Sequence, residues 1–591
     1  MWDEFQLGRG PLVAFDSGPT AAWAQLFADT PNYLGIGLAF SGDKFRWHFG
    51  PMFYRGRTAA GAAKVLVIGQ EGAQDESLSH RSFTGGTGAR MQNLLNHIGI
   101  GHSYMFLNTF VYPINGQYDG GFPKLGQDPR SPIAQHRNKI LDLASNTHDL
   151  RLVVAVGKAA KESCVSWLKS HGGTGKPEEL HKANGGVIRA GLRFVGVPHP
   201  GGAGKGGNVT AIIAGFKAAI AQIETWAAAD AGWLPVDPGS TRSTAASYKY
   251  RSAPIPFADF PFGTTWRLGS SGTSSNRRDG QTSIQLFSSD GKYNNLGVTV
   301  SYSIGPGSKT GYAQDAGDIE VEPPRAHPMG FDPGPGEFAE LLTGSSAGRD
   351  WPNFAQLGLS VHPSFGFGPS YRGRLKKPSV LVLADQASHD DLFTGRALTG
   401  EAGQRLQGWL RAAGLTTRYA IVRTLPVDSL SSSAATVRAA VDQPAVRAIL
   451  TAVIAKAAPK VVVAIGPQAS RIAAAVSPTG MKVVPMKAWA DTPAVLTDWR
   501  RALDDLKPLT YTKDVTASFN WDGARGQIPR EDLPYGTLRW QGSSGDRATQ
   551  AKTGGAPNPD YFKFEMPGWA AALSPPPLSA ADQAAVNALK S

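Results

Sequence analysis

Polar side chains follow three short apolar segments in the first half of the chain. Gln70 and Glu71 come directly after "KVLVIG", Asn108 ends "YMFLN", and His199 follows "FVGVP". If each segment is a strand of a parallel sheet, the carboxyl ends share one edge and these groups line one pocket. An acid, an amide and an imidazole there suit cleavage of a bond to a planar polar ring. The acid orients a water, the amide reads the edge of the ring, and the imidazole faces charge on the leaving group.

An aromatic ring comes from the loop "HRSFTGG" (80–86), which precedes an expected helix. Phe83 of this loop is placed to stack on the bound ring. The acidic pair Asp75 and Glu76 is better suited to capping the following turn than to catalysis. Taken singly, Phe83 reads as a core residue and His199 as a structural one. The order of Glu71, Phe83, Asn108 and His199 along the chain, taken together, favours a functional site.

The elements that position these side chains occur twice in the sequence. "FGPMFYRGR" (49–57) returns as "FGPSYRGR" (367–374), and each leads into an apolar strand, a helix and a second strand. The segment 255–272 also returns, as 528–545. Strands that alternate with helices predict α/β domains with mostly parallel sheets. We therefore expect two tandem α/β domains, each followed by an irregular or β-rich extension.

Composition indicates where these parts begin and end. Residues 233–350 are rich in Gly, Ser, Pro and Thr and contain β-like alternation. The predicted parts are an N-terminal extension (1–44), a first α/β domain (45–232), a Gly/Ser/Pro-rich extension with some β structure (233–350), a second α/β domain (363–507) and a tail extension (508–591). The tail ends in a Pro-rich linker and a short helix.

The second copy lacks most of the candidate chemistry. Asp385 keeps an acid after the first strand, but Ala384 replaces Gly69. Arg423 occupies the position of Asn108, and Met486 is aligned with His199. A pocket without the amide and the imidazole is not expected to catalyse the same reaction. We expect a degenerate copy that is retained for packing or for a grip on a ligand.

Bulk composition excludes several classes of protein. No apolar run reaches the ~18 residues of a membrane span, and the first residues lack a signal-peptide pattern. A single cysteine, Cys164, excludes a disulfide framework and any four-cysteine metal or iron–sulfur site. We expect no metal, no cofactor and a cytoplasmic location. The formal charge of +12 fits a polyanionic partner, although it is also ordinary for this length.

The order of the motifs resembles the uracil-DNA glycosylase superfamily. The motifs are Gly-Gln-Glu-Gly-Ala-Gln-Asp-Glu (69–76), Arg-Ser-Phe-Thr-Gly (81–85), Leu-Asn-Thr (107–109) and Pro-His-Pro-Gly (198–201). The resemblance covers roughly residues 60–225, with a weaker echo over 378–500. This resemblance implies three-layer α/β/α domains and the activity of a DNA glycosylase that takes part in DNA repair. Such an enzyme hydrolyses the N-glycosidic bond of uracil or another modified base that is flipped out of DNA.

The resemblance also implies roles for individual residues. Glu71 activates the water while Gln70 lines the pocket, and both count as catalytic together with His199, which polarises a base carbonyl. Phe83 stacks on the base and Asn108 reads its edge. The remaining implied contacts are with the base through Gly69 and Gly72, and with DNA through Arg81, Pro200, Gly201 and Lys205.

Several departures from the family pattern leave the target base open. Proline is absent from the first motif, the third motif reads His-Pro-Gly-Gly, and the cluster cysteines of the most similar type are missing. A non-catalytic binding protein for altered bases or DNA ends, or a scaffold in a repair or defence assembly, remains an alternative. Strand preference, a covalent adduct and the oligomeric state also stay open. The Gly-rich stretches 85–90 and 201–207 match neither a dinucleotide fingerprint nor a P-loop.

Overall fold

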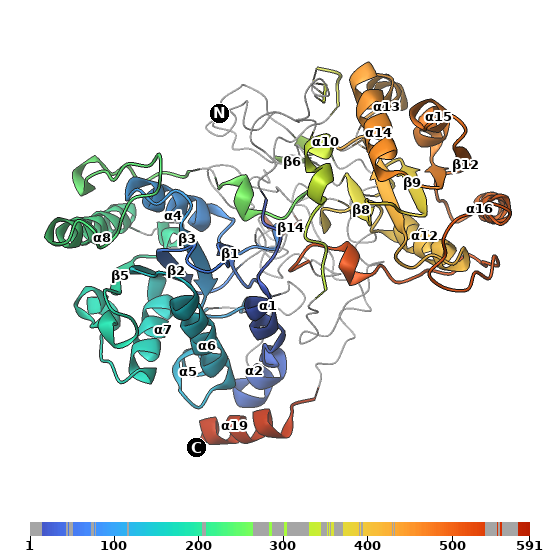
Figure 1. Cartoon of the computed structure of the whole chain (residues 1–591). Helices are drawn as coiled ribbons and strands as arrows, with labels where there is room; N and C mark the ends of the chain where they lie inside the picture. The colour runs from blue at the N-terminus through green and yellow to red at the C-terminus, as the bar shows by residue number, and fades with distance from the viewer. Residues whose placement is uncertain are drawn as a thin grey trace.

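The computed structural model describes residues 15–42, 51–72, 79–114, 117–203, 208–253, 255–263, 330–343, 370–388, 394–427, 432–537 and 577–591, with short stretches and single residues between these ranges. Two α/β units account for most of them, the first coloured blue to green and the second yellow to orange in Figure 1. None of the helices in this described part is long and apolar enough to cross a membrane. Lys205 and Asp75 lie outside the described residues.

The first unit is built on a five-stranded sheet in the order β1-β3-β2-β4-β5. Only β1 is antiparallel to its neighbour. The strands are β1 (Arg55–Gly56), β2 (Val65–Gly69), β3 (Tyr104–Asn108), β4 (Leu152–Val156) and β5 (Arg193–Val197). The central strands are buried along their whole length, which explains their continuous apolar sequences.

Helices cover both faces of this sheet. Alternate residues of β2 point to opposite faces, so Val65 and Val67 pack with α4 and α8, and Leu66 and Ile68 pack with the helices of the other face. The helices are α1 (Ala21–Ala28), α2 (Tyr33–Ser41), α4 (Gly86–His97), α5 (Phe122–Gln127), α6 (Pro132–Thr147), α7 (Gly157–Ser170) and α8 (Val209–Ala229). The result is the expected three-layer α/β/α arrangement. Helices α1 and α2 belong to this core, although the sequence assigned them to a separate extension.

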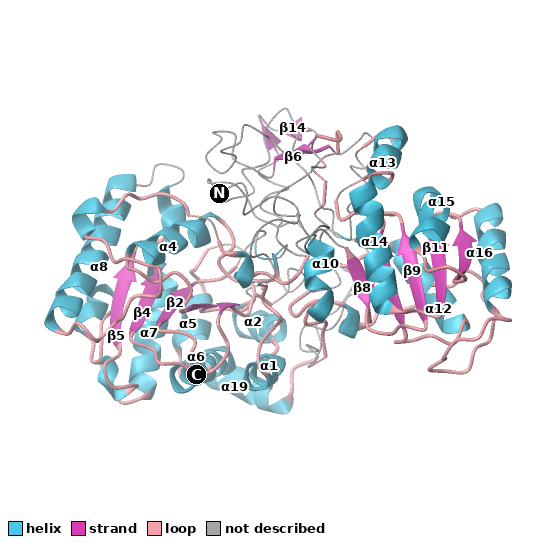
Figure 2. Ribbon diagram, turned by 45° about the horizontal axis from the view of Figure 1, so that its top comes forward, coloured by secondary structure: helices cyan, strands magenta, loops and turns pink. Residues whose placement is uncertain are grey.

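The second unit has the same topology. Its sheet runs in the order β8-β10-β9-β11-β12, and again only the first strand is antiparallel. Its strands are β8 (Tyr371–Gly373), β9 (Val380–Ala384), β10 (Tyr419–Arg423), β11 (Val461–Ile465) and β12 (Lys482–Met486). Its helices are α10 (Ala339–Thr343), α12 (Glu401–Ala412), α13 (Ala434–Val441), α14 (Pro444–Ala457), α15 (Pro467–Val476) and α16 (Pro493–Leu506). Figure 2 shows the two sheets, each between layers of helices.

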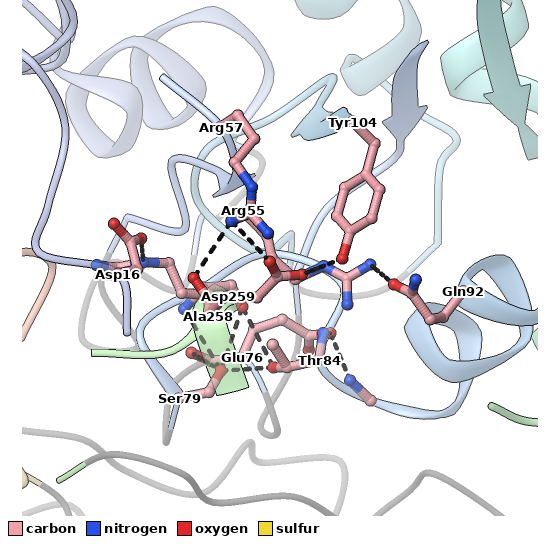
Figure 3. Close-up of polar contacts among 12 residues, drawn as sticks. Asp16, Arg55, Arg57, Glu76, Ser79, Thr84, Gln92, Tyr104, Ala258 and Asp259 are labelled. Atoms are coloured by element: carbon pink, nitrogen blue, oxygen red, sulfur yellow. Dashed lines mark hydrogen bonds and ion pairs between the residues drawn. The ribbon is translucent and has the colours of Figure 1, made fainter. Parts of the chain in front are cut away.

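Each unit holds the start of its own extension through a buried aspartate. In the first unit Asp259 accepts a hydrogen bond of 2.7 Å from the Tyr104 hydroxyl, and it pairs with Arg57 at 3.1 Å and with Arg55 at 3.6 Å (Figure 3). The Arg55 guanidinium also donates to Gln92 of α4. This cluster attaches the extension to the outer strands of the sheet.

The second unit repeats this cluster at the corresponding positions. Asp532 pairs with Arg372 at 2.8 Å and accepts from the Tyr419 hydroxyl, and Arg372 donates to Gln407 of α12. The cluster persists in a unit that lacks the candidate chemistry. We therefore assign it to the architecture and not to a reaction.

Other described segments of the extensions include a strand pair and the C-terminal helix. The strands β6 (Ser283–Gln285) and β7 (Ser301–Ser303) pair in antiparallel fashion, in agreement with the expected β structure of the first extension. The expected C-terminal helix is α19 (Ala580–Lys590), which packs on α2 of the first unit (Figure 1). Its residues Val586 and Leu589 join the core of that unit.

Candidate active site

Three of the predicted residues meet at the carboxyl end of β2. A Cβ atom added to Gly69 would lie 2.4 Å from Cζ of Phe83 and 2.7 Å from Oδ1 of Asn108. Neither distance leaves space for a methyl group, so Gly69 is required for the close approach of the two side chains. Gly69 and Asn108 are directly paired in the parallel ladder of β2 and β3. The ladder and the glycine together bring the amide and the ring into contact.

The Asn108 side chain has a buried oxygen that lacks a hydrogen-bond partner in the described part of the chain. Its Nδ2 donates to Oγ of Ser82 at 3.3 Å, and Ser82 in turn donates to the Met52 carbonyl at 2.8 Å. Because the Ser82 proton is used for that carbonyl, its oxygen is left to accept, and the amide must point its nitrogen towards it. Among the described residues, none donates a hydrogen bond to Oδ1 of Asn108. An unpaired buried acceptor costs about 1–3 kcal/mol, which a ligand donor would recover.

The backbone of Phe83 adopts a left-handed conformation with φ of +57°. Gly88 of α4 packs so closely on the Phe83 carbonyl that a Cβ atom there would lie 1.6 Å from its oxygen. The ring lies 5.0 Å from that of Phe106 of β3, centroid to centroid. In the second unit Leu398 has the same conformation, with φ of +51°. The strained loop is therefore common to both units, and only the aromatic ring is particular to the first.

The Glu71 carboxylate, two residues after the end of β2, is held by local hydrogen bonds. Its Oε2 accepts from the backbone N–H of Ile114, and Gln70 Nε2 donates to Oε1 at 3.4 Å. Both side chains are partly exposed. The carboxylate is thus oriented by the protein and remains within reach of solvent, as the activation of a water requires.

His199 lies at the same edge of the sheet, after β5. The backbone N–H of Gly201 donates to its Nδ1 at 3.0 Å. A ring nitrogen that accepts carries no proton, so the neutral ring bears its proton on Nε2. Partial desolvation, and then the positive charge of Arg90, lower the pKa of His199 below its usual value. The exposed imidazole is therefore a neutral donor through Nε2.

Gly157 connects His199 to the rest of the site. It begins α7 at the end of β4, the strand between β2 and β5, and has a φ of +82°. A Cβ atom there would lie 3.2 Å from the Cβ of His199. Neither Gly157 nor Ser82, which orients Asn108, was predicted from the sequence as a site residue. For Gly157 the sequence did contain a signal, namely a glycine at the turn from a predicted strand to a predicted helix.

Two of the predicted contacts need correction. Arg81 is buried, with its Nε 2.6 Å from Oδ2 of Asp16 and its guanidinium 4.8 Å from the Tyr54 ring centroid. This guanidinium is an internal ion pair and is not on a surface that DNA reaches. Gly72 is buried, and a Cβ atom there would lie 1.9 Å from Sδ of Met52, so its contacts are with the protein core.

The other predicted residues have simpler surroundings. Pro200 is buried and Gly201 is exposed, both in the 3-10 helix η4 (Pro200–Ala203) that follows His199. Glu76 accepts hydrogen bonds from the backbone N–H groups of Thr84 and Gly85, just before α4. This capping role is the one that the sequence predicted for it. No cluster of potential metal ligands is present among the described residues.

The second unit has different groups at every corresponding position. Gln386 replaces Glu71 and accepts from the backbone N–H of Ser429 at 2.7 Å and from the Arg423 guanidinium at 2.8 Å. Leu398 replaces Phe83. Asp385 accepts from the backbone N–H groups of Gln468 and Ala469 at the start of α15, and burial raises its pKa. Arg423 and Asp385 are therefore engaged within the protein.

The alignment of Met486 with His199 is wrong. Met486 pairs with Ile465 in the ladder of β11 and β12, as Val197 pairs with Val156 in that of β4 and β5. Met486 is therefore the counterpart of Val197, and it is buried in the core. The position of His199, two residues later, is occupied by Ala488. The second unit still has no imidazole there.

Comparison with protein families agrees with this geometry. Residues 56–208 match the model of the Uracil DNA glycosylase superfamily. This range contains the candidate site residues Gly69, Gln70, Glu71, Phe83, Asn108 and His199. No curated protein matches the chain. The first α/β unit is accordingly a domain of the uracil DNA glycosylase superfamily.

Proposed function

We propose that the first unit is a DNA glycosylase that hydrolyses the N-glycosidic bond of uracil or another modified base flipped out of DNA. The observation that carries this proposal is the Oδ1 of Asn108, to which no described residue donates a hydrogen bond and which is packed against Gly69 beside the Phe83 ring. A flat base with a ring N–H would stack on the aromatic face and donate to this oxygen. The membership of the superfamily supports the same class of reaction.

The amide gives the proposed site its selectivity. Uracil carries a proton on the ring nitrogen at its pairing edge, whereas cytosine carries a lone pair there. With Nδ2 of Asn108 turned towards Ser82, the amide offers an acceptor to the base. Cytosine would leave two acceptors facing each other, which costs the site its hydrogen bond and adds repulsion. We therefore expect uracil to be preferred over cytosine.

Cleavage of the N-glycosidic bond leaves negative charge on the base and positive charge on the sugar. The site has one group that stabilises each charge. The bond between the sugar C1′ and the base nitrogen breaks, and its electron pair goes to the base. Nε2–H of His199 donates to the base carbonyl oxygen on which the negative charge develops. Glu71 orients a water towards C1′, stabilises the cationic sugar and takes the proton of the water. The products are the free base and an abasic sugar.

The test is incubation of the protein with labelled oligonucleotides that each contain one altered base, followed by alkali. Breakage at the altered base supports turnover. A stable shift in a gel without breakage, for every base offered, would favour the non-catalytic binding alternative and contradict the proposal. The oligonucleotides need to be tested in single- and double-stranded form.

Substitutions in the two units provide matched variants. Glu71→Gln is expected to lower the rate of cleavage by about 10²–10⁴-fold, as loss of a general base does, with binding retained. The control is Gln386→Ala at the equivalent position of the second unit, which should leave the rate unchanged. An equal loss in both variants would show that the effect comes from folding.

A further inference from the structure

Arg90 is a cation whose hydrogen-bond donors are not used by any of the described residues. It lies on α4, is partly exposed, and makes no hydrogen bond or ion pair within the described part of the chain. By contrast, the nearby Arg55 and Arg81 are buried and paired with aspartates. A guanidinium has five N–H donors in a planar fork, which suits a carboxylate or a phosphate.

An aromatic ring supports this guanidinium. The guanidinium carbon of Arg90 lies 5.6 Å from the centroid of the Tyr250 ring. Tyr250 in turn packs edge-on against Phe216 of α8, with ring centroids 5.3 Å apart. A cation held over a ring face is oriented without using its N–H donors. The arrangement therefore presents the fork of Arg90 to a ligand.

The location of Arg90 connects it to the candidate site. Helix α4 packs against η4, the turn that follows His199, and Arg90 is the charged group that acts on the His199 imidazole. In the proposed reaction the base enters at the edge of the sheet that carries His199 and η4. We therefore expect the phosphates next to the extrahelical nucleotide to lie on the same side as Arg90.

The second unit uses the equivalent arginine internally. Arg405 has the same position relative to the start of its helix, since α4 and α12 begin after Gly85 and Gly400. It donates to the Gly523 carbonyl and to Glu401, and its guanidinium lies 5.1 Å from the Trp489 ring centroid. The unit without the candidate chemistry thus has no available arginine at this position.

We propose that Arg90 binds a backbone phosphate of DNA beside the nucleotide whose base occupies the pocket, and that Tyr250 positions its guanidinium. This inference rests on the proposed function for its ligand, but it concerns binding and not the cleavage step. A phosphate contact positions the strand without reading sequence. It also releases counterions, so it contributes to the salt dependence of binding.

The experiment measures the affinity for a uracil-containing duplex and for the same duplex without uracil over a range of salt concentrations. Arg90→Gln should weaken binding to the uracil-containing duplex more than to the duplex without uracil, and it should lower the slope of log K against log salt for the uracil-containing duplex by about 0.9, the value of one duplex phosphate contact. Arg90→Lys should keep most of the slope. Tyr250→Phe keeps the ring and should behave as the unmodified chain, whereas Tyr250→Ala should weaken binding. Arg411→Gln, at an exposed arginine of α12, is the control.

The outcomes separate this inference from the proposed function. If no base is excised but Arg90→Gln still lowers the slope, the phosphate contact stands and the glycosylase proposal fails. If excision occurs and Arg90→Gln changes neither affinity nor slope, the phosphate contact is overturned. A loss of rate at saturating DNA with unchanged binding would also overturn it, because Arg90 would then act through His199. Melting curves of the variants establish that they are folded.

Discussion

Arg81 of the first unit donates a hydrogen bond of 2.7 Å to the backbone carbonyl of Tyr535, a residue 454 positions later in the extension of the second unit. The reciprocal contact is also present, since Arg396 donates to the carbonyl of Phe262 in the first extension. Each extension therefore contacts its own unit through Asp259 or Asp532. Further along, a backbone carbonyl of the same extension accepts a hydrogen bond from a buried arginine of the other unit.

The segments that precede the two units contact each other, and each pairs with the buried arginine of its own unit. A Cβ atom on Gly18 would lie 2.4 Å from the Phe331 ring, and one on Gly334 would lie 2.4 Å from the Phe15 ring. Asp16 and Asp332 pair with Arg81 and Arg396, each at 2.6 Å. The two units are thus joined by a near-symmetric interface in which each supplies parts of the other.

This interface predicts that the two units unfold together. Arg81→Ala leaves the Asp16 carboxylate without its partner, and removal of one partner of a buried pair costs about 3–5 kcal/mol. We expect a loss of this size in the free energy of unfolding, in one cooperative transition followed by circular dichroism in denaturant. Arg396→Ala should cost a similar amount, and Arg411→Ala, at an exposed position, almost nothing. Two separate transitions in the unmodified chain would contradict the prediction.

Removal of α19 is expected to destabilise the first unit. Its residues Val586 and Leu589 are fully buried, and the Leu589 carbonyl accepts from Lys124. Burial of two such side chains contributes about 3–6 kcal/mol, as an upper estimate. A chain that ends at residue 576 should therefore melt at a lower temperature. Gln583→Ala on the exposed side of the helix is the control and should leave the melting temperature within about a degree, since surface substitutions usually change stability little.

Gly69→Ala should block the pocket through the Phe83 ring. The added methyl group would lie 2.4 Å from Cζ of Phe83, so the ring or the strand has to move, at a cost of about 1–3 kcal/mol. The second unit has Ala384 and Leu398 at these positions. The double variant Gly69→Ala with Phe83→Leu should therefore recover stability but not excision. A double-mutant cycle of unfolding free energies tests this, and additive losses would contradict it.

The rate of excision should fall in acid when His199 becomes protonated. Protonation places a donor on Nδ1 opposite the Gly201 N–H and breaks that hydrogen bond. Because the pKa of His199 is lowered in the folded state, the unfolded chain binds this proton more readily and stability decreases as the pH falls from about 6.5 towards the folded value. NMR titration of the imidazole should give a midpoint below 6.5. That midpoint should coincide with the acidic limb of the pH–rate profile.

Arg90→Gln provides a control for this titration. Its positive charge contributes to the lowered pKa of His199, so its removal should move the midpoint of the titration upward. His136 and His148 also have lowered pKa values, through burial, and should not respond to this substitution. A midpoint of His199 that does not move would show that Arg90 has little electrostatic effect on the imidazole.

Local sequence patterns were sufficient to predict the strands, the helices that follow them and the residues at the strand ends. Buried parallel strands have continuous apolar sequences, and their carboxyl ends share one edge. For this reason the pairing of Gly69 with Asn108 at one edge of the sheet follows from sequence order, whereas Phe83 reaches them through the left-handed loop before α4. The capping role of Glu76 was predicted in the same way, because a cap depends only on neighbours along the chain.

Contacts between distant segments were not predictable in this way. Arg81 was expected to be at the surface, and it is buried because Asp16 and the Tyr535 carbonyl supply its partners. Met486 was aligned by sequence with His199, whereas its place is set by the ladder with Ile465. The sequence by itself thus determined the α/β layout and the groups at the edge of the first sheet. Only the tertiary structure decided which charged residues are available to DNA, because burial and pairing depend on residues brought together by folding.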